Sequence, residues 1–217
     1  MTTLASALIS KAKILAQDTG NIRWADAEWL GWASDGQREI CIVRPPAFSK
    51  IANVTMVAGT KQAIPTDGVT FLEYMRSMGA GGATPGLTAR KVPRRLLDGQ
   101  NPGWHAVTAV AVPTHYVFEP LAPKVFYVYP PSTGAQQCEI LYAASPPDIA
   151  TIATAISLDD IYGSVLIDYM LYRGYSKDAE LIGNAERSML SRKAFENALG
   201  LKERADAGTV AAANERG

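Results

Sequence analysis

The chain of 217 residues lacks the residue groups that metal and redox sites need. It has two cysteines, Cys41 and Cys138, each isolated in an apolar run, and two histidines, His105 and His115, ten residues apart. No CxxC motif or Cys/His cluster is present, so we expect no metal site. The apolar surroundings favour two buried free thiols, while a disulfide between the cysteines stays open as the alternative.

A surplus of charge and a long apolar run are also missing. The formal net charge is zero, with 21 basic and 21 acidic residues. A free nucleic-acid-binding domain usually carries a basic surplus, so this balance argues against that class, and it gives copies of the chain little mutual repulsion. No run of about 18 apolar residues occurs, so no membrane span is expected. The amphipathic N-terminal segment lacks the basic start of a secretory signal, which favours a reducing compartment.

No arrangement typical of an enzyme can be recognised. Ser164 lies inside a predicted helix and lacks the strand-to-helix turn of a nucleophile elbow. Asp159 and Asp160 stand where a helix begins, which gives both carboxylates a structural role. The glycine-rich residues 79–86 lead into a predicted strand, so they indicate a flexible hairpin tip and not a phosphate loop. We therefore expect no catalytic residues, no cofactor and no enzymatic activity.

The residues that are present predict an α+β fold. Apolar residues at helical spacing indicate helices over residues 1–45 and 157–200, and short alternating runs indicate a β-rich segment over residues 50–145. We predict a single domain over residues 1–200, in which the N- and C-terminal helices pack together beside a central antiparallel β region. Gly200 is expected to end the last helix, and residues 201–217 to form an extended C-terminal arm.

The stretch HYVFEPLAPKVFYVYPP, residues 115–131, holds five of the chain's eighteen aromatic residues. Strand alternation places Tyr116 with Phe118 on one face and Tyr127 with Tyr129 on one face, while Phe126 points the opposite way. A platform for stacking bases needs one exposed aromatic face. The pattern therefore favours a strand pair that packs on protein, either inside the domain or against a neighbouring subunit. In the predicted helix near residue 170, Tyr169, Tyr172 and Arg173 share a face, which suits either an interface or the core.

Five segments, taken in order, resemble the head-to-tail adaptor proteins of tailed bacteriophages, also described as connector or tail tubular proteins. They are GNIRWADAEWLGWASDGQREI with VRPPA, LLDGQNPGWH, HYVFEPLAPKVFYVYPP, LDDIYGSVLIDYMLYRGYSKDAE and AFENALG. The resemblance covers about residues 1–200.

This resemblance implies a structural virion protein without enzymatic activity. Such adaptors form a ring, commonly of twelve copies, beneath the portal at the junction of capsid vertex and tail, and they surround the channel for the genome. The implied partners are copies of the chain, the portal protein, a tail nozzle or other tail protein, and the DNA that passes through. Assembly is expected in the host cytoplasm.

Three sets of residues are the candidate contact sites. The C-terminal segment is expected to meet the portal through Leu201, Lys202, Arg204, Val210 and Arg216. Contacts with neighbouring subunits or the tail are assigned to side chains of the aromatic strands and of the helix near residue 170: Tyr116, Phe118, Tyr127, Tyr129, Tyr169, Tyr172 and Arg173. A basic run is the candidate for DNA in the channel: Arg90, Lys91, Arg94 and Arg95. The alternative function is a nucleic-acid-binding module that uses the aromatic strands and this basic run.

Overall fold

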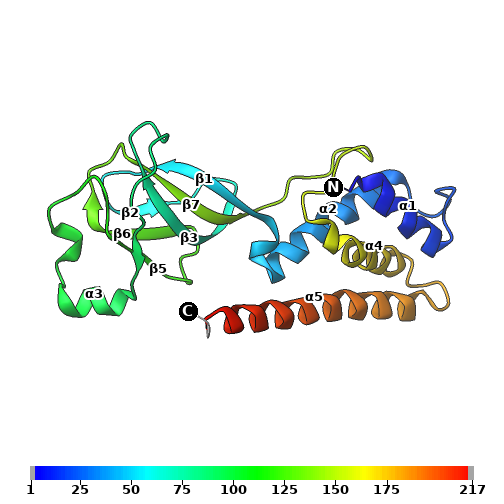
Figure 1. Ribbon diagram of the computed structural model, residues 1–217. Coiled ribbons are helices and arrows are strands. Elements are labelled where there is room, and N and C mark those ends of the chain that lie inside the picture. The colour runs from blue at the N-terminus through cyan, green and yellow to red at the C-terminus, as the bar shows by residue number, and fades with distance from the viewer. Residues whose placement is uncertain (1–2, 215–217) are drawn as a thin grey trace. The chain divides into compact units, whose positions relative to one another are not determined.

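The computed structural model describes residues 3–214, with side chains through residue 200, and divides into two compact units. The helical unit comprises Met1–Ala47 and Pro146–Gly217, and the β unit comprises Phe48–Ser145. The predicted α+β class is confirmed, with N- and C-terminal helices that pack together and an antiparallel β region between them in the sequence (Figure 1). The prediction of one domain over residues 1–200 differs from this division, because the β-rich segment encloses an aromatic core of its own.

In the helical unit, α4 is the central helix. The helices α1 (Ala5–Ala16), α2 (Asp26–Val43) and α5 (Asn184–Asn214) all pack on α4 (Gly163–Lys177), and α4 follows the short helix η3 (Asp160–Tyr162). Two glycines allow close approach: a Cβ at Gly36 would lie 2.9 Å from the Tyr169 ring, and one at Gly174 would lie 3.0 Å from the Trp24 ring. A larger residue at Gly36 would push α2 away from α4, and one at Gly174 would push the Trp24 ring of the preceding loop away from α4.

The C-terminal helix is longer than the sequence predicts. Gly200 does not end it, because α5 continues to Asn214 and spans 31 residues. A glycine inside a helix costs only about 1 kcal/mol relative to alanine, and the lysine, arginine, glutamate and alanine residues that follow are good helix formers. The prediction of an extended arm after residue 200 is therefore wrong through residue 214, where the backbone is helical. Residues 215–217 lie outside the described part of the chain.

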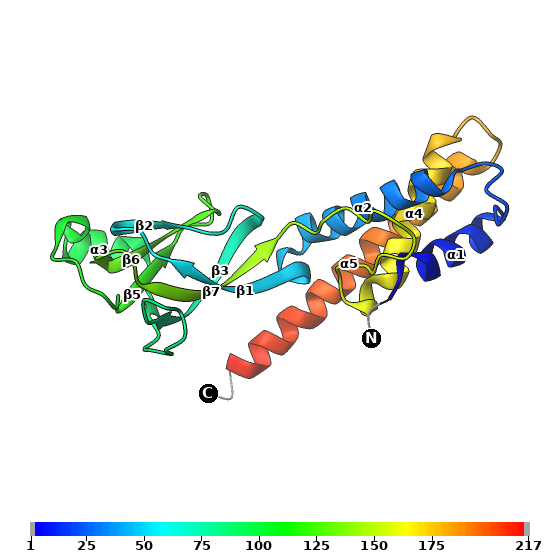
Figure 2. The same cartoon turned by 90° about the horizontal axis from the view of Figure 1, so that it is seen from above.

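The β unit contains two sheets, which are visible in Figures 1 and 2. The order β1-β7-β3 forms the first sheet and β2-β6-β5-β4 the second, and every neighbouring pair is antiparallel except the parallel pair β4–β5. Two short helices, α3 (Arg94–Gln100) and η2 (Trp104–Ala106), lie between β4 and β5 in the sequence, and η1 (Pro45–Phe48) precedes β1. The strands are β1 (Ser49–Thr55), β2 (Gly59–Ala63), β3 (Gly68–Met78), β4 (Arg90–Lys91), β5 (His115–Phe118), β6 (Val125–Ser132) and β7 (Gln137–Ala144).

An aromatic core holds the β unit together. Side chains from both sheets contribute to it, and the rings of Phe71 and Phe126 stack with centroids 4.4 Å apart. Tyr74 stacks on Tyr116 at 5.8 Å, and Phe126 has no exposed surface. Aromatic pairs of this kind add roughly 1 kcal/mol to the effect of their burial.

Both cysteines are free and buried, and they lie in different units. Cys41 belongs to the helical unit and Cys138 to the β unit. The structure contains no disulfide between them, which was the alternative that the sequence left open. Burial raises the pKa of the Cys41 thiol to about 11 and that of Cys138 to about 12. Both thiols are therefore protonated and unreactive at neutral pH.

Hydrogen bonds order the glycine-rich residues 79–86, which the sequence indicated as a flexible tip. Within the segment, the Gly79 N–H donates to Thr84 O at 3.0 Å. Side chains of two strands hold it from outside: Asn53 Nδ2 of β1 donates to Gly82 O at 3.0 Å, and Gln137 Nε2 of β7 donates to Ala80 O at 3.4 Å. The loop is thus attached to the first sheet at two points.

Gly82→Ala is expected to lower the free energy of unfolding by about 1–2 kcal/mol, because alanine is strained in the left-handed region. Gly82 has a φ of +71°, and a Cβ there would lie 2.2 Å from Gln137 Oε1. Gly81→Ala is the matched control, since a Cβ at Gly81 meets no atom within 4 Å. Urea unfolding of both variants checks the expectation, and equal stabilities would contradict it.

Candidate functional site

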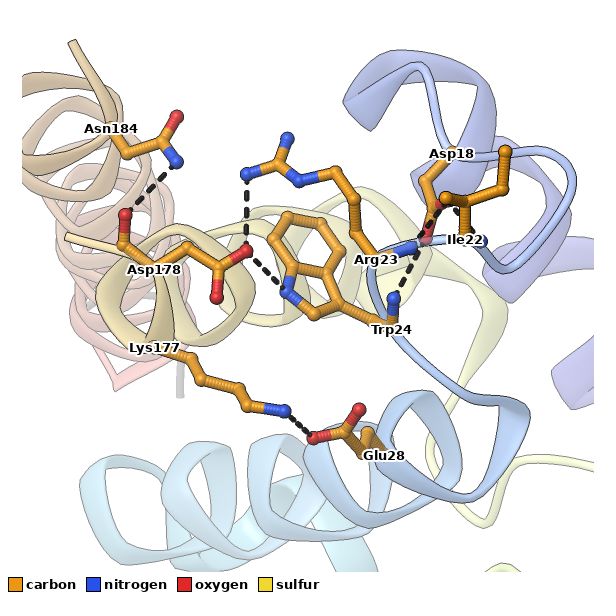
Figure 3. A network of polar contacts seen from close by, with 8 residues as sticks. All are labelled: Asp18, Ile22, Arg23, Trp24, Glu28, Lys177, Asp178 and Asn184. Atoms are coloured by element: carbon orange, nitrogen blue, oxygen red, sulfur yellow. Dashed lines mark hydrogen bonds and ion pairs between the residues drawn. The ribbon is translucent and has the colours of Figure 1, made fainter. Parts of the chain in front are cut away.

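A buried carboxylate fixes the loop between α1 and α2. Asp18 is 3% exposed and accepts hydrogen bonds from the backbone N–H groups of Ile22 (2.8 Å), Arg23 (3.1 Å) and Trp24 (3.0 Å), as Figure 3 shows. Burial alone would raise the pKa of Asp18, but the three N–H donors lower it below its ordinary value. Carboxylates that accept several backbone N–H bonds are stabilised in the charged form. This loop is therefore held in one conformation.

A second carboxylate joins this loop to the loop between α4 and α5. Asp178 Oδ2 accepts from Arg23 at 3.2 Å and from Trp24 Nε1 at 3.0 Å (Figure 3). Its backbone oxygen accepts from Asn184 Nδ2 at 3.1 Å, which fixes the start of α5. Asp178 thus connects two segments that lie about 155 residues apart in the sequence.

Aromatic rings and ion pairs complete this junction. Trp24 is fully buried and packs edge to face on Trp29 at 5.3 Å, on Trp32 at 5.7 Å and on Tyr175 at 5.7 Å. Two ion pairs bridge neighbouring elements, Lys177 with Glu28 and Lys13 with Asp26. This junction was not predicted from the sequence, although the segment DTGNIRW, an aspartate followed by turn residues and a tryptophan, is a signal for a capped loop.

Exposed large apolar side chains occur on both loops of this junction and in the last turn of α1. Ile22 is 90% exposed on the first loop, and Ile182 is fully exposed on the second. Figures 1 and 2 show both loops at the same end of the helical unit. We call this set the apolar tip; its members are Ile14, Leu15, Ile22, Leu181 and Ile182.

Asp18→Asn is expected to lower the free energy of unfolding by about 1–3 kcal/mol at pH 7, because an amide cannot accept three N–H bonds as the carboxylate does. The lowered pKa of Asp18 stabilises the fold above the unfolded pKa of about 4, and this contribution disappears as pH falls through the folded pKa. The difference between wild type and variant should therefore shrink below about pH 4. Urea unfolding between pH 3 and 7 measures it.

Glu180→Gln serves as the control for this series, because Glu180 is an exposed carboxylate in the other loop. A difference between Asp18→Asn and wild type that stays constant down to pH 3 would contradict the role given to the charge of Asp18.

The aromatic strand pair predicted from the sequence exists, and its first face belongs to the core. β5 and β6 pair with Tyr116 opposite Val128 and Phe118 opposite Phe126. Tyr116 is buried and Phe118 is partly buried against the same core. Tyr116 therefore has no surface to offer to another subunit.

The second face of this pair is covered within the same unit by the DGQNPGWH segment. Trp104 is 1% exposed and lies 6.3 Å from Tyr127 and 6.2 Å from Tyr129, centroid to centroid. Asp98 holds it in place by accepting from Trp104 Nε1 at 2.9 Å, and Arg94 pairs with the same carboxylate. Both faces are thus packed, and Tyr127 and Tyr129 remain only partly exposed. No open aromatic platform for bases is left on these strands.

The helix face of Tyr169, Tyr172 and Arg173 is also largely internal. Tyr169 is 4% exposed, packs on Phe195 of α5 and accepts a hydrogen bond from Arg173 at 3.2 Å. Tyr172 and Arg173 are half-buried and retain some surface. Of this set, only Tyr172 and Arg173 remain available for contacts with other chains.

The basic run lies on the exposed side of the β unit. Arg90 and Lys91 form the edge strand β4, and Arg94 and Arg95 begin α3. Arg90 lines a groove of about 400 Å³ together with His115, whose Nδ1 lies 2.9 Å from Thr114 Oγ1. The groove walls are otherwise Leu87, Thr88, Val112, Pro113 and Thr114.

The candidate portal residues fall at the end of the described chain. Leu201, Lys202, Arg204 and Val210 lie on α5, where the backbone alone is described. Arg216 lies outside the described residues.

The residues considered for chemistry have structural partners. His105 stacks on Trp104 and contacts Thr60 Oγ1 through Nδ1 at 2.8 Å. The Asp159 carboxylate accepts from Ile161 N–H at the start of η3, and that of Asp160 accepts from Thr3 N–H. Within residues 3–214, no three His, Cys, Asp or Glu side chains are grouped as a metal site would need. No helix in this part of the chain is long and apolar enough to cross a membrane.

Both units carry exposed large apolar side chains, which suit contact with other chains. A family model described as SU10 adaptor protein matches residues 3–216. The chain therefore belongs to the SU10 adaptor protein family, a family of phage head-to-tail adaptors, which confirms the resemblance found in the sequence. Membership implies a structural role in the virion, in association with portal and tail proteins. No curated protein matches the chain.

Proposed function

We propose that the protein is a ring-forming adaptor that joins the portal to the tail and surrounds the DNA channel. Twelve copies form the ring at the capsid vertex-tail junction, after synthesis and assembly in the host cytoplasm. The observation that carries this proposal is the family match over residues 3–216. The zero net charge and the exposed apolar side chains of both units favour packing of copies against one another.

The C-terminal arm, residues 201–217, is the proposed portal contact. The length of α5 supports this role, because its 31 residues extend about 46 Å at 1.5 Å per residue, against about 22 Å for the 15 residues of α4. A helix so much longer than the one it packs on can reach another chain. Its proposed contact residues are Leu201, Lys202, Arg204, Val210 and Arg216.

The remaining contacts use the β unit and the face of α4. Phe118, Tyr127, Tyr129, Tyr172 and Arg173 keep enough exposure to meet a neighbouring subunit or a tail nozzle. The basic run Arg90, Lys91, Arg94 and Arg95 is the proposed contact with DNA in the lumen, because cationic side chains attract phosphates.

Mass measurement of the purified protein, alone and mixed with its portal, tests the proposal. The expected result is a complex of portal with twelve times the 23.3 kDa of one chain. A chain lacking residues 201–217 should fail to join this complex, and its far-ultraviolet circular dichroism spectrum checks that it is folded. A full-length protein that stays monomeric and never binds portal would contradict the proposal.

A further inference from the structure

β1 is an open edge of the first sheet. It pairs with β7 over seven residues without a register shift, and the strand order β1-β7-β3 leaves its other side without a neighbour. Its sequence SKIANVT contains no proline, and its one charged residue, Lys50, is bound to Asp67 at 2.7 Å. Proteins usually protect sheet edges with prolines, bulges, free charges or short strands. β1 therefore lacks the features that keep an edge from pairing with another chain.

The other three edges of the two sheets are protected. β4 has only two residues, and β2 is interrupted by a register shift. On the outer side of β3, the Phe71 N–H donates to Pro123 O at 2.8 Å. Further along the same side, the Ser77 N–H donates to Leu87 O at 2.8 Å. β1 is thus the one regular and uncovered edge that residues 3–214 contain.

Strand geometry places four backbone positions on the open side of β1. In an antiparallel ladder, the N–H and C=O groups of successive residues point alternately toward the neighbouring strand and away from it. The Met56 N–H, directly after β1, donates to Gln136 O at 2.8 Å, so Met56 and every second residue before it point toward β7. The positions that point outward are Ser49, Ile51, Asn53 and Thr55. No other segment within residues 3–214 bonds to their backbone groups.

The side chains of β1 define which strand fits beside it. Ile51 is 60% exposed, while Ala52 and Val54 on the opposite face are partly buried against the aromatic core of the β unit. A strand added at this edge continues both faces of the sheet. Apolar residues at every second position of such a strand would cover the exposed parts of Ala52 and Val54.

We propose that β1 binds an extended segment of a different virion protein, which adds a fourth strand to the first sheet. The segment is free of proline over about five residues and carries apolar residues at alternate positions. Main-chain hydrogen bonds to the outward groups of β1 supply affinity, and the alternating side chains supply specificity. This inference rests on the proposed adaptor function and adds a contact surface separate from the C-terminal arm and the basic run.

The chemistry of this edge selects protein over DNA. Its free groups are backbone N–H donors and C=O acceptors in alternation, which another extended backbone complements at every second residue. Phosphate oxygens can only accept hydrogen bonds, and they bind where cations neutralise them. The one cation of the strand, Lys50, already pairs with Asp67.

A second copy of the chain offers no matching strand within residues 3–214. In a ring generated by rotation the contacts are head to tail, so the open edge of β1 meets a different surface of the neighbouring copy and not its β1. The other sheet edges of that copy are short, bulged or covered. Two irregular segments are also used internally: the N–H groups of Ile149 and Ser157 bond to side chains of α2, and those of Val110 and Thr114 bond to β6.

Hydrogen exchange of the unmodified chain, free and in virus particles, tests this contact. The outward amides of Ile51, Asn53 and Thr55 should exchange at least about tenfold more slowly in particles, since hydrogen bonds to a new strand protect them. The amides of Ala52 and Val54 already face β7 and are the internal control, with little change expected. Equal exchange of the outward amides in both states would overturn the proposal.

Photocrosslinking in virus particles identifies the chain that lies beside β1. Ile51→p-benzoylphenylalanine is expected to crosslink to a segment with alternating apolar residues in one virion protein other than this chain. A crosslink to a second copy of the chain or to DNA, or no crosslink at all, would contradict the assigned occupant.

Two substitutions at one position separate the backbone contact from the side chain. Ile51→Pro removes an outward N–H, and proline is tolerated at such edge positions. This variant should fold and form the ring, but reduce the yield of infectious particles at least about tenfold. Ile51→Thr keeps the N–H in a residue that favours strands, and should give the wild-type yield.

The outcomes distinguish this inference from the proposed function. A folded Ile51→Pro variant with normal yield would refute the β1 contact alone, whereas failure of the wild-type chain to form a ring with portal would refute the proposed function. Because the exchange comparison needs no substitution, it decides the case if Ile51→Pro does not fold.

Discussion

Trp24→Ala is expected to lower the free energy of unfolding of the helical unit by about 4 kcal/mol, the largest effect of any single substitution there. Trp24 is fully buried, and its removal leaves a cavity among Trp29, Trp32 and Tyr175. The change also removes the indole N–H donor to Asp178, so the Arg23–Asp178 contact alone then joins these two carboxylate-linked loops. Urea unfolding followed by far-ultraviolet circular dichroism measures the loss.

The control Trp24→Phe divides this effect into its two causes. Phenylalanine retains most of the ring packing but cannot donate a hydrogen bond to Asp178. We expect a loss of about 1–2 kcal/mol, the cost of one unsatisfied partner together with a small cavity. If Trp24→Ala and Trp24→Phe were equally destabilising, ring packing would not be the main contribution of Trp24.

Phe126→Ala is the second substitution with a large expected effect, a loss of about 4 kcal/mol in the β unit. Phe126 is fully buried and packs on Phe71, Tyr74 and the strand opposite it. The adjacent residue provides a matched control, because Tyr127 lies on the other face of β6 and is only partly buried. Tyr127→Ala should cost about half as much or less.

Urea unfolding of these two neighbours tests how the aromatic strand pair is packed. The account requires Phe126→Ala to be clearly more destabilising than Tyr127→Ala. The reverse order would mean that the Trp104 face, and not the face shared by the two sheets, forms the main core of the β unit.

Local patterns predicted most of the elements, and tertiary contacts explain the failures. The alternating runs predicted over residues 50–145 include β3, β6 and β7, and the helical segment predicted over residues 1–45 contains α1 and α2. Residues 105–113 alternate equally well, yet residues 105 and 106 belong to η2, whose Trp104 is buried, and the rest contribute a bridge from Val110 to Ser132 and no strand. Gly200 resembles a helix end, but the residues after it favour helix strongly enough to continue α5.

The candidate contact sites were harder to predict, since exposure depends on which segment covers a side chain. Tyr116 and Tyr169 suit an interface by their chemistry, and the structure buries both. Ile22 and Ile182 show the opposite case, since both are apolar and yet exposed. No periodic pattern in the sequence distinguishes them from buried isoleucines, and their exposure depends on two loops whose conformation is held by hydrogen bonds to Asp18 and Asp178. Family membership was accessible from the sequence because it depends on ordered segments such as DGQNPGWH, where Asp98 and Trp104 bind each other.

Electron cryo-microscopy of the purified virus at the capsid vertex-tail junction tests the central claim most directly. The account predicts a ring of twelve copies of this chain immediately below the portal, with the helical and β units recognisable in each copy and the DNA channel along the axis. A junction built from another chain, with this protein absent from the portal-tail connection, would contradict it.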